Sequence, residues 1–312
     1  MINIILTALI VFLIAIIIFL TLKIRRIKGQ NIRDIIKNPE KNNTICDKHS
    51  VNIVQEETKV TETIINGLNS DEFKLYIQFV VDSKTKKIVS GEGLSRWVSG
   101  DRGIINPGEY IPVMEESGLI TDLDYYMFEK ICSQLENWGK EGLGHLSLSC
   151  NITRITISEK DFVEKIKSIS KKYAFDRSRL IIEITEDAIE KDRENAMENI
   201  VKSKELGFRV ALDDLGNGYT SLLNLCEYPV DVVKIDREIL LKTDTKRGID
   251  LFCGIIALAH NLGLKAVCEG VETEEQNKLV IDSGCDYIQG WYYSKAMPLG
   301  ECDNFIKEYK VV

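Results

Sequence analysis

The stretch IIEITEDAIEKDRENAMENIVKSKELGFRVALDD (Ile181–Asp214) decides the fold. It contains two short apolar runs, Leu180–Thr185 and Arg209–Asp213, that are typical of buried strands. The segment between them, Asp192–Leu206, has the length and pattern of a helix that stops at Gly207. The stretch therefore predicts a strand–helix–strand unit whose two strands lie parallel in one sheet.

Both of these strands end in carboxylates, and three further apolar runs end in charged or amide side chains. The three are VVKID (Val232–Asp236), AVCEGVE (Ala266–Glu272) and YIQG (Tyr287–Gly290). An unpaired carboxylate at the edge of a core is costly, and the C-terminal ends of parallel strands lie on one side of a sheet. The acidic groups therefore converge at the edge of the sheet where the parallel strands end, which we call the mouth, and divalent cations bound there would relieve their mutual repulsion. The sequence predicts a metal site there.

Eight strands with interleaved helices are expected in about 240 residues, the size of a βα-barrel. The expected strands are Phe73–Val81, Lys87–Leu94, Leu146–Ile152, Leu180–Thr185, Arg209–Asp213, Asp231–Ile235, Lys265–Cys268 and Asp286–Gln289, the first two joined as a hairpin. The predicted fold class is α/β, a TIM-like (β/α)8 barrel with an N-terminal transmembrane helix. An open doubly wound sheet is the alternative, which the lack of a GxGxxG after the first strand disfavours.

Composition narrows the function class. The 312 residues are 44% hydrophobic, enough for a sizeable core, and the net charge of −8 argues against a nucleic-acid partner. The eight cysteines form no CxxC pair and the three histidines are scattered, so a zinc centre is not expected. Free thiols in a reducing compartment are the expectation.

The N-terminus has a different composition. Ile4–Leu22 carries no charged residue and spans roughly 28 Å as a helix, about one hydrocarbon core. Basic residues follow it at Lys23, Arg25, Arg26 and Lys28, which predicts a single-pass anchor in the cytoplasmic membrane with the rest of the chain in the cytoplasm. A cleaved signal peptide is the alternative, and it would place basic residues before a shorter apolar run. The expected parts are an anchor (residues 1–22), a basic polar linker (23–50) and a catalytic domain (51–312).

Seven segments together resemble the EAL-domain family, the bacterial cyclic di-GMP phosphodiesterases. They are GEGLSRW (Gly91–Trp97), CNIT (Cys150–Thr153), IIEITE (Ile181–Glu186), ALDDLGNGYTSL (Ala211–Leu222), PVDVVKID (Pro229–Asp236), CEGVET (Cys268–Thr273) and YIQG. Each is weak alone, but all seven occur in the family's order, and the resemblance covers roughly Val51 to Lys310. It implies hydrolysis of cyclic di-GMP to linear pGpG, and a homodimer formed through the barrel.

The resemblance also implies roles for the matching residues. It implies the metal ligands Glu92, Asn151, Glu183, Asp213, Asp214 and Glu269, the catalytic residues Glu92, Lys234 and Glu269, and the substrate contacts Gln78, Leu94, Arg96, Asp236 and Gln289. Glu186 and Glu272 are expected to order loops. Hard oxygen ligands suit Mg²⁺ or Mn²⁺, and two such ions can hold an attacking hydroxide and the phosphoryl oxygens for in-line displacement.

Structural roles are the alternative for each residue taken singly. Carboxylates at strand ends are often helix N-caps, Lys234 and Arg96 could balance charge, and Asn151 could be a turn residue. Asp236 is expected to orient Lys234. The joint spacing of Glu183, Asp213 and Glu269, one strand–helix unit apart, favours the metal site. Among functions, a catalytically silent receptor for cyclic di-GMP is the alternative to an enzyme.

The chain departs from the family pattern near two of these residues. Gly93 replaces the alanine of the EAL triplet, which is expected to loosen the backbone beside Glu92. After Asp214, Leu215 replaces a phenylalanine and Asn217 a threonine. In the family this loop links the metal site to dimer contacts, so the changes bear on rate and dimer coupling.

Overall fold

The computed structural model describes residues 60–216 and 224–309. The chain divides into two compact units. One comprises Met1–Asp71 and Ile105–Ile120, and the other comprises Glu72–Ile104 and Thr121–Val312. The predicted anchor and linker, and residues 51–59 of the predicted catalytic domain, lie outside the described residues. Within the described part, no helix combines the length and the apolar character needed to cross a membrane.

The described part of the first unit is helical. A helix covers residues 60–69, and α3 covers Pro107–Ser117. Pro107 suits the first turn of α3, where no N–H is needed, and Glu109 accepts a hydrogen bond from the N–H of Asn106. Gly118 ends the helix in the left-handed region, at φ 74°.

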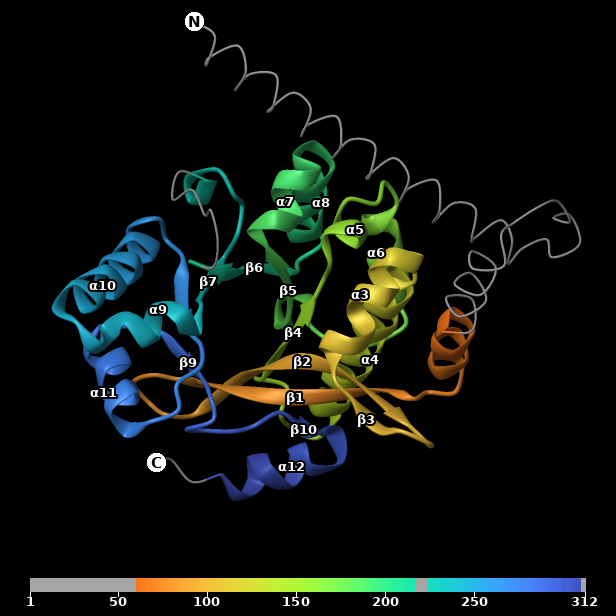
Figure 1. The fold of residues 1–312 in the computed structure, drawn as a ribbon, viewed down its shortest axis with the longest axis horizontal. Coiled ribbons are helices and arrows are strands. Elements are labelled where there is room, and N and C mark those ends of the chain that lie inside the picture. The colour runs from red at the N-terminus through yellow and green to blue at the C-terminus, as the bar shows by residue number, and fades with distance from the viewer. Residues whose placement is uncertain (1–59, 217–223, 310–312) are drawn as a thin grey trace, which may run out of the picture. The chain divides into compact units, whose positions relative to one another are not determined.

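The second unit contains a closed barrel of eight strands, which confirms the predicted barrel (Figure 1). The strands are β1 (Phe73–Asp82), β2 (Ile88–Ser99), β4 (Ser147–Asn151), β5 (Leu180–Thr185), β6 (Arg209–Leu215), β7 (Val232–Ile235), β8 (Lys265–Cys268) and β9 (Tyr287–Gln289). They pair in the order β1-β9-β8-β7-β6-β5-β4-β2, and a β1–β2 pair closes the ring.

One strand runs against the others. β1 pairs antiparallel with both β2 and β9, whereas the remaining barrel pairs are parallel. The cause is the predicted hairpin, whose turn is held by Asp82: its carboxylate accepts the N–H groups of Lys84 and Thr85, and Lys86 adopts φ 59°. The barrel is therefore a variant of the all-parallel (β/α)8 form. Two short strands that the sequence did not predict, β3 (Gly103–Ile105) and β10 (Met297–Pro298), extend the sheet beyond β2 and β1.

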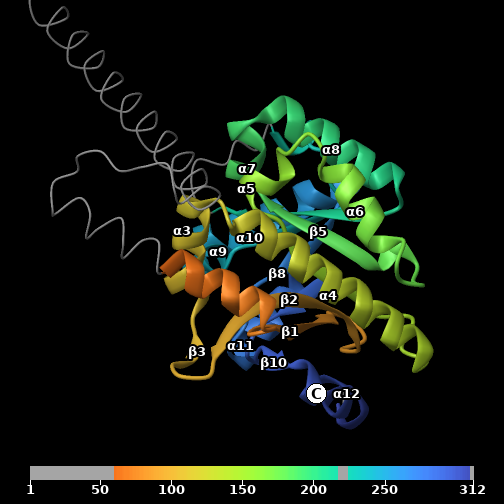
Figure 2. The ribbon, with the colours of Figure 1, turned by 90° about the vertical axis from the view of Figure 1, so that its right-hand side faces the viewer.

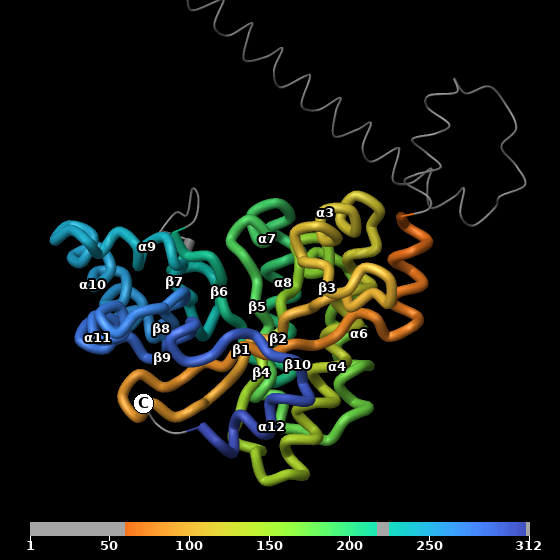
Figure 3. The backbone as a smooth tube through the Cα atoms, turned by 60° about the horizontal axis from the view of Figure 1, so that its bottom comes forward, coloured from red at the N-terminus to blue at the C-terminus, as the bar shows by residue number. Residues whose placement is uncertain are grey.

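Helices follow most strands and lie outside the barrel. They are α4 (Ile120–Lys140), α5 (Arg154–Ile157), α6 (Phe162–Ser170), α7 (Glu186–Lys191), α8 (Arg193–Glu205), α9 (Arg237–Leu241), α10 (Lys246–Asn261), α11 (Glu274–Asp282) and α12 (Leu299–Glu308). Figure 2 shows α4 as a long helix crossing the outside of β2, and Figure 3 shows α9, α10 and α11 grouped beside β7, β8 and β9.

The interior of the barrel is layered by the two-residue period of its strands. One apolar cluster consists of Val80, Ile181, Ala211, Val232 and Val267, one from each of five strands, with Tyr287 packed against it. Two residues further toward the C-terminal ends of the parallel strands stand Glu183, Asp213, Lys234, Glu269 and Gln289. The apolar layer therefore forms a floor, and the polar side chains point into the mouth above it.

Candidate active site

Four carboxylates surround the ammonium group of Lys234 at this mouth. Its Nζ lies 3.2 Å from Glu92 Oε2, 3.2 Å from Glu183 Oε2, 3.3 Å from Asp213 Oδ1 and 2.7 Å from Glu269 Oε1. The lysine side chain is only 3% exposed. The structure thus brings together five of the residues that the sequence singled out, from positions as far apart as 92 and 269.

Amide side chains orient the first of these carboxylates. Asn151 Nδ2 donates to Glu92 Oε1 at 2.8 Å, and Gln289 Nε2 donates to Glu92 Oε2 at 2.7 Å. Gln289 Nε2 also lies 3.3 Å from Gln78 Oε1, and Gln78 Nε2 donates to the main-chain carbonyl of Ser294 at 3.2 Å. Glu92 is therefore fixed from both sides by uncharged donors from β4 and β9.

The four carboxylates at this mouth carry more charge than the one ammonium group of Lys234 can balance. Burial alone would raise the pKa of Glu92, but Lys234 and the hydrogen bonds from Gln289 and Asn151 outweigh it and lower that pKa. For Glu183 burial dominates, and the neighbouring carboxylates add to it, so its pKa lies well above the usual value despite Lys234. Burial likewise raises the pKa of Glu269 to about 7. One ammonium does not compensate four buried carboxylates.

This excess of negative charge fits a divalent cation. Glu183 Oε2 is buried and, although 3.2 Å from Lys234 Nζ, has no hydrogen-bond partner among the described residues. Within that same part of the chain, no three His, Cys, Asp or Glu side chains are already spaced as metal ligands, because the carboxylates point at Lys234. The oxygens of Glu92, Asn151, Glu183, Asp213 and Glu269 form a hard donor set, the kind that Mg²⁺ and Mn²⁺ prefer. These residues would hold the metal.

Asp213 and Asp214 reach the same mouth through an irregularity of β6. The register of β6 against β7 shifts between Leu212 and Leu215, and Asp214 adopts φ 58°. In a regular strand two consecutive side chains would point to opposite faces. Burial, and after it the negative charges of Asp213 and Asp236, raise the pKa of Asp214. The amide N–H of Asp214 also donates to Asp213 Oδ1 at 2.9 Å.

Other predicted residues lie around this cluster. Asp236 caps α9, since its Oδ1 accepts the N–H of Glu238 at 2.6 Å, and this replaces the expected contact with Lys234. Glu272 pairs with Arg237 Nη2 at 3.0 Å, and Glu186 is the first residue of α7.

Two predicted substrate contacts lie further along β2. Arg96 Nη1 donates to the carbonyl of Ser95 at 2.8 Å, and its guanidinium lies over the Tyr76 ring. Leu94 is half-buried and pairs with Tyr76 on β1. Both lie beyond Glu92 on the same strand.

The environment of Gly93 differs from the expectation. Gly93 pairs with Ile77 on β1 and with Cys150 on β4, so it lies inside two ladders. A Cβ at this position would lie 2.6 Å from Ile131 Cδ1 and 2.9 Å from the carbonyl oxygen of Ser149. The prediction that Gly93 loosens the backbone is therefore wrong: the glycine permits tight packing of α4 on β2.

Two supporting groups were missed from the sequence. Asp124 is buried on α4, and its Oδ2 accepts the N–H and the hydroxyl of Thr153 and the hydroxyl of Thr156, which fixes the turn after Asn151. Ser294 is buried as well and accepts the N–H of Phe79 on its hydroxyl oxygen. Both are small polar residues outside the strand-end pattern, so spacing gave no signal for them.

Comparison with known proteins gives a consistent result. A family model described as the EAL domain matches residues 61–296. The chain is 32% identical over 274 residues to the signaling protein YkoW of Bacillus subtilis, covering 86% of this chain and 34% of the relative. It is 30% identical over 236 residues to the cyclic di-GMP phosphodiesterase RocR of Pseudomonas aeruginosa, covering 75% of this chain and 60% of the relative. The chain thus spans about a third of YkoW.

Solved structures share the fold. The PaMucR phosphodiesterase in complex with c-di-GMP superposes with a TM-score of 0.74 at 26% identity, covering 78% of this chain and 99% of that one. An EAL domain protein from Listeria monocytogenes gives a TM-score of 0.69 at 28% identity, covering 80% and 98%.

Proposed function

Because the chain belongs to the EAL domain family, we propose that it hydrolyses one phosphodiester of cyclic di-GMP to give linear pGpG. The observation that carries this proposal is the buried ring of four carboxylates around Lys234, with Asn151 and Gln289 holding Glu92. A purely structural lysine would need one carboxylate partner, and four leave an excess of negative charge that suits cations and a phosphodiester substrate.

The proposed cofactor is a pair of Mg²⁺ or Mn²⁺ ions, which when bound would lower the pKa of a water and neutralise charge on the phosphoryl oxygens. The chain's own residues supply the rest. Glu269, whose Oε1 lies 2.7 Å from Lys234 Nζ, would accept a proton from the attacking water. The ammonium of Lys234 remains charged, since its pKa lies well above the usual value, and it would stabilise negative charge on the phosphoryl oxygens.

Several residues would position the substrate. Gln78 and Gln289 present amide groups beside Glu92, and Arg96 stands four residues further along the same strand. A guanidinium fork suits the second phosphate of a cyclic dinucleotide. The half-exposed position of Arg96 leaves it accessible to such a substrate.

The test is the conversion of cyclic di-GMP to pGpG by the full chain with Mg²⁺ or Mn²⁺, followed by chromatography. We expect turnover that EDTA abolishes and that Asp213→Asn reduces at least about a hundredfold. Asp244→Asn is the matched control, because Asp244 is exposed and lies between α9 and α10, outside the group of four carboxylates that contact Lys234. Tight binding of cyclic di-GMP without product at any Mn²⁺ concentration would instead identify a silent receptor.

We also propose that Ile4–Leu22 anchors the protein in the cytoplasmic membrane, with the barrel in the cytoplasm, and that the barrel forms homodimers. The apolar run and the basic residues after it support the anchor, and the family resemblance supports the dimer. Fractionation of cells tests the anchor: recovery of the full-length protein in the soluble fraction would rule it out. Mass measurement of the detergent-solubilised chain tests the dimer.

A further inference from the structure

A second polar site lies at the opposite ends of three barrel strands. A cavity of about 540 Å³ is lined there by residues at the starts of β4 and β6, by α4 and by the segment that ends directly before β5. Among the lining residues, Ser147 and Arg209 are the first residues of β4 and β6, and Arg179 directly precedes β5; they lie four residues before Asn151, Asp213 and Glu183, respectively. The apolar layer of the barrel interior lies between the two levels, so the cavity is separate from the carboxylates around Lys234.

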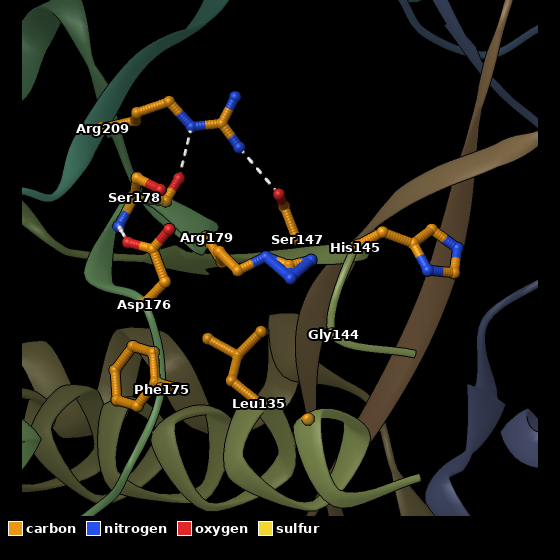
Figure 4. A pocket seen from close by; sticks show the side chains of 10 residues that line it. Leu135, Gly144, His145, Ser147, Phe175, Asp176, Ser178, Arg179 and Arg209 are labelled. Atoms are coloured by element: carbon orange, nitrogen blue, oxygen red, sulfur yellow. Dashed lines mark hydrogen bonds between the residues drawn. The ribbon is translucent and has the colours of Figure 1, made fainter. Parts of the chain in front are cut away.

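Two guanidinium groups are held in place in this cavity (Figure 4). Arg209 Nε donates to the carbonyl of Ser178 at 2.7 Å, and its Nη2 donates to the hydroxyl of Ser147 at 2.8 Å. Arg179 Nη2 donates to the carbonyl of Leu146 at 2.6 Å. A guanidinium has five N–H donors, so each arginine keeps further donors while its side chain is immobilised. Prearranged donors of this kind lose little entropy when an oxyanion binds.

The local charge is positive although the chain as a whole carries −8. Among the described residues that line the cavity, Asp176 is the one with a carboxylate, and its Oδ1 already accepts the N–H of Ser178 at 3.0 Å. Burial lowers the pKa of Arg179; Asp176 opposes this shift and the neighbouring Arg209 adds to it. Two arginines thus face a single, engaged carboxylate, and a bound dianion would balance them.

The other wall of the cavity is apolar. Figure 4 shows Arg179 between Arg209 and the side chains of Leu135 and Phe175. Gly139 and Gly144 also line the cavity, and a Cβ on Gly139 would meet no atom within 4 Å. A volume of this size falls in the range of small-molecule sites.

We propose that this cavity binds a small organic phosphate, with the phosphate between Arg179 and Arg209 and an aromatic or aliphatic body against Leu135 and Phe175. Planar guanidinium forks bind phosphate oxygens in pairs, and two of them match the dianion of a phosphomonoester. A carboxylate would neutralise only one arginine. The proposal does not depend on the proposed phosphodiesterase activity, because no residue of the cavity takes part in that site.

Calorimetry on the full chain tests the proposal, with adenosine monophosphate as the probe and EDTA present so that metal-dependent binding at the other end is suppressed. We expect saturable binding at one site per chain, weaker binding of inorganic phosphate and no binding of adenosine. Arg209→Gln should raise the dissociation constant about tenfold or more, because it removes a charge-assisted pair of hydrogen bonds. Arg247→Gln is the matched control, since Arg247 is exposed on α10, and it should leave the constant unchanged.

A second variant guards against loss of folding. Gly139→Leu keeps both arginines and adds bulk at a residue that lines the cavity, where leucine is also the better helix former, so it should weaken binding with an unchanged or higher unfolding temperature. Hydrogen exchange should slow on peptides covering residues 139–147 and 175–180 when the probe binds. Absence of binding, binding that both Arg209→Gln and Gly139→Leu retain, or slowed exchange confined to residues 269–289 would each overturn the proposal.

Discussion

Restoring the family's alanine at position 93 should destabilise this protein. An ideal Cβ on Gly93 lies 2.6 Å from Ile131 Cδ1, 2.9 Å from Ser149 O and 3.1 Å from Leu75 Cδ1. Ile131 is fully buried, and Ser149 O belongs to the backbone of β4 beside Glu92. Neither neighbour can withdraw without disturbing the core or the ladder that positions Glu92 and Asn151.

The magnitude follows from two opposing effects. Overpacking of a core costs about 1–3 kcal/mol, and replacing glycine by alanine in an ordinary backbone conformation returns about 0.4–1 kcal/mol. Gly93 is not among the glycines with positive φ, so alanine suffers no backbone strain there. The net expectation for Gly93→Ala is a loss of about 1–2 kcal/mol in the free energy of unfolding, which lowers the unfolding temperature by roughly 2–8 °C for a domain of this size.

A double-mutant cycle identifies the cause. Ile131→Val alone should cost about 0.5–1.5 kcal/mol, because it removes a buried methyl group. Combined with Gly93→Ala it removes the clashing Cδ1, so the double variant should be more stable than the sum of the single effects by about 0.5 kcal/mol or more. Thermal unfolding of the parent, the two single variants and the double variant measures the coupling between the two positions. A Gly93→Ala protein as stable as the parent, or purely additive effects, would refute the packing argument.

Three further substitutions each remove one charged side chain and test its contribution to stability. Lys234→Met should end turnover. In EDTA it should also lower the free energy of unfolding by about 3–5 kcal/mol, because it leaves buried carboxylates without a cation. An unchanged unfolding temperature would contradict this. Asp124→Ala should lower stability by about 1–3 kcal/mol and raise hydrogen exchange at residues 151–156, since three donors lose their acceptor. Asp286→Asn should lower stability at pH 7 by about 1–2 kcal/mol through weaker bonds to Lys265 and His260. Burial would raise the pKa of Asp286, but its hydrogen bonds lower it overall, so this contribution is present above the unfolded pKa, near 3.8, and is lost as pH falls through the lower folded pKa. Unfolding curves for parent and variant between pH 7 and pH 3 should therefore converge at the acid end.

The strand ends could be located from the sequence because two independent patterns coincide there. Short apolar runs such as those before Glu183 and Asp213 predict strands, and a charged residue directly after an apolar run marks the strand's end. The parallel connection then places these ends together whatever the detailed packing. This reasoning required no knowledge of the side-chain contacts and pointed to the charged ends of these runs, while the family resemblance implied the roles of Glu183, Asp213, Lys234 and Glu269 within them.

What could not be read from the sequence depends on local irregularity or on distant packing. Consecutive aspartates at 213 and 214 alternate in an ideal strand, and only the register shift of β6 and the positive φ of Asp214 bring both to one mouth. Gly93 looked permissive because its conformational freedom is visible in the sequence, whereas its contact with Ile131 on α4 is not. Asp236 illustrates a third case, since an acidic residue after a strand is equally suited to cap the next helix, and here it caps α9.

The two-residue period of the strands relates the acidic residues at one end of the barrel to the arginines at the other end. Counting backwards from Asp213 in steps of two gives Ala211 in the apolar layer and Arg209 at the far end, and the same steps from Glu183 give Ile181 and Arg179. Arg209 begins β6, whereas Arg179 directly precedes β5, and in both cases one apolar side chain of the same face separates the basic residue from the acidic one. Four residues of backbone separate them by roughly 13 Å, which is too far for a direct ion pair between either arginine and the carboxylates. The charge excess around Lys234 must therefore be met at its own mouth, while the arginines are available to an anion at theirs.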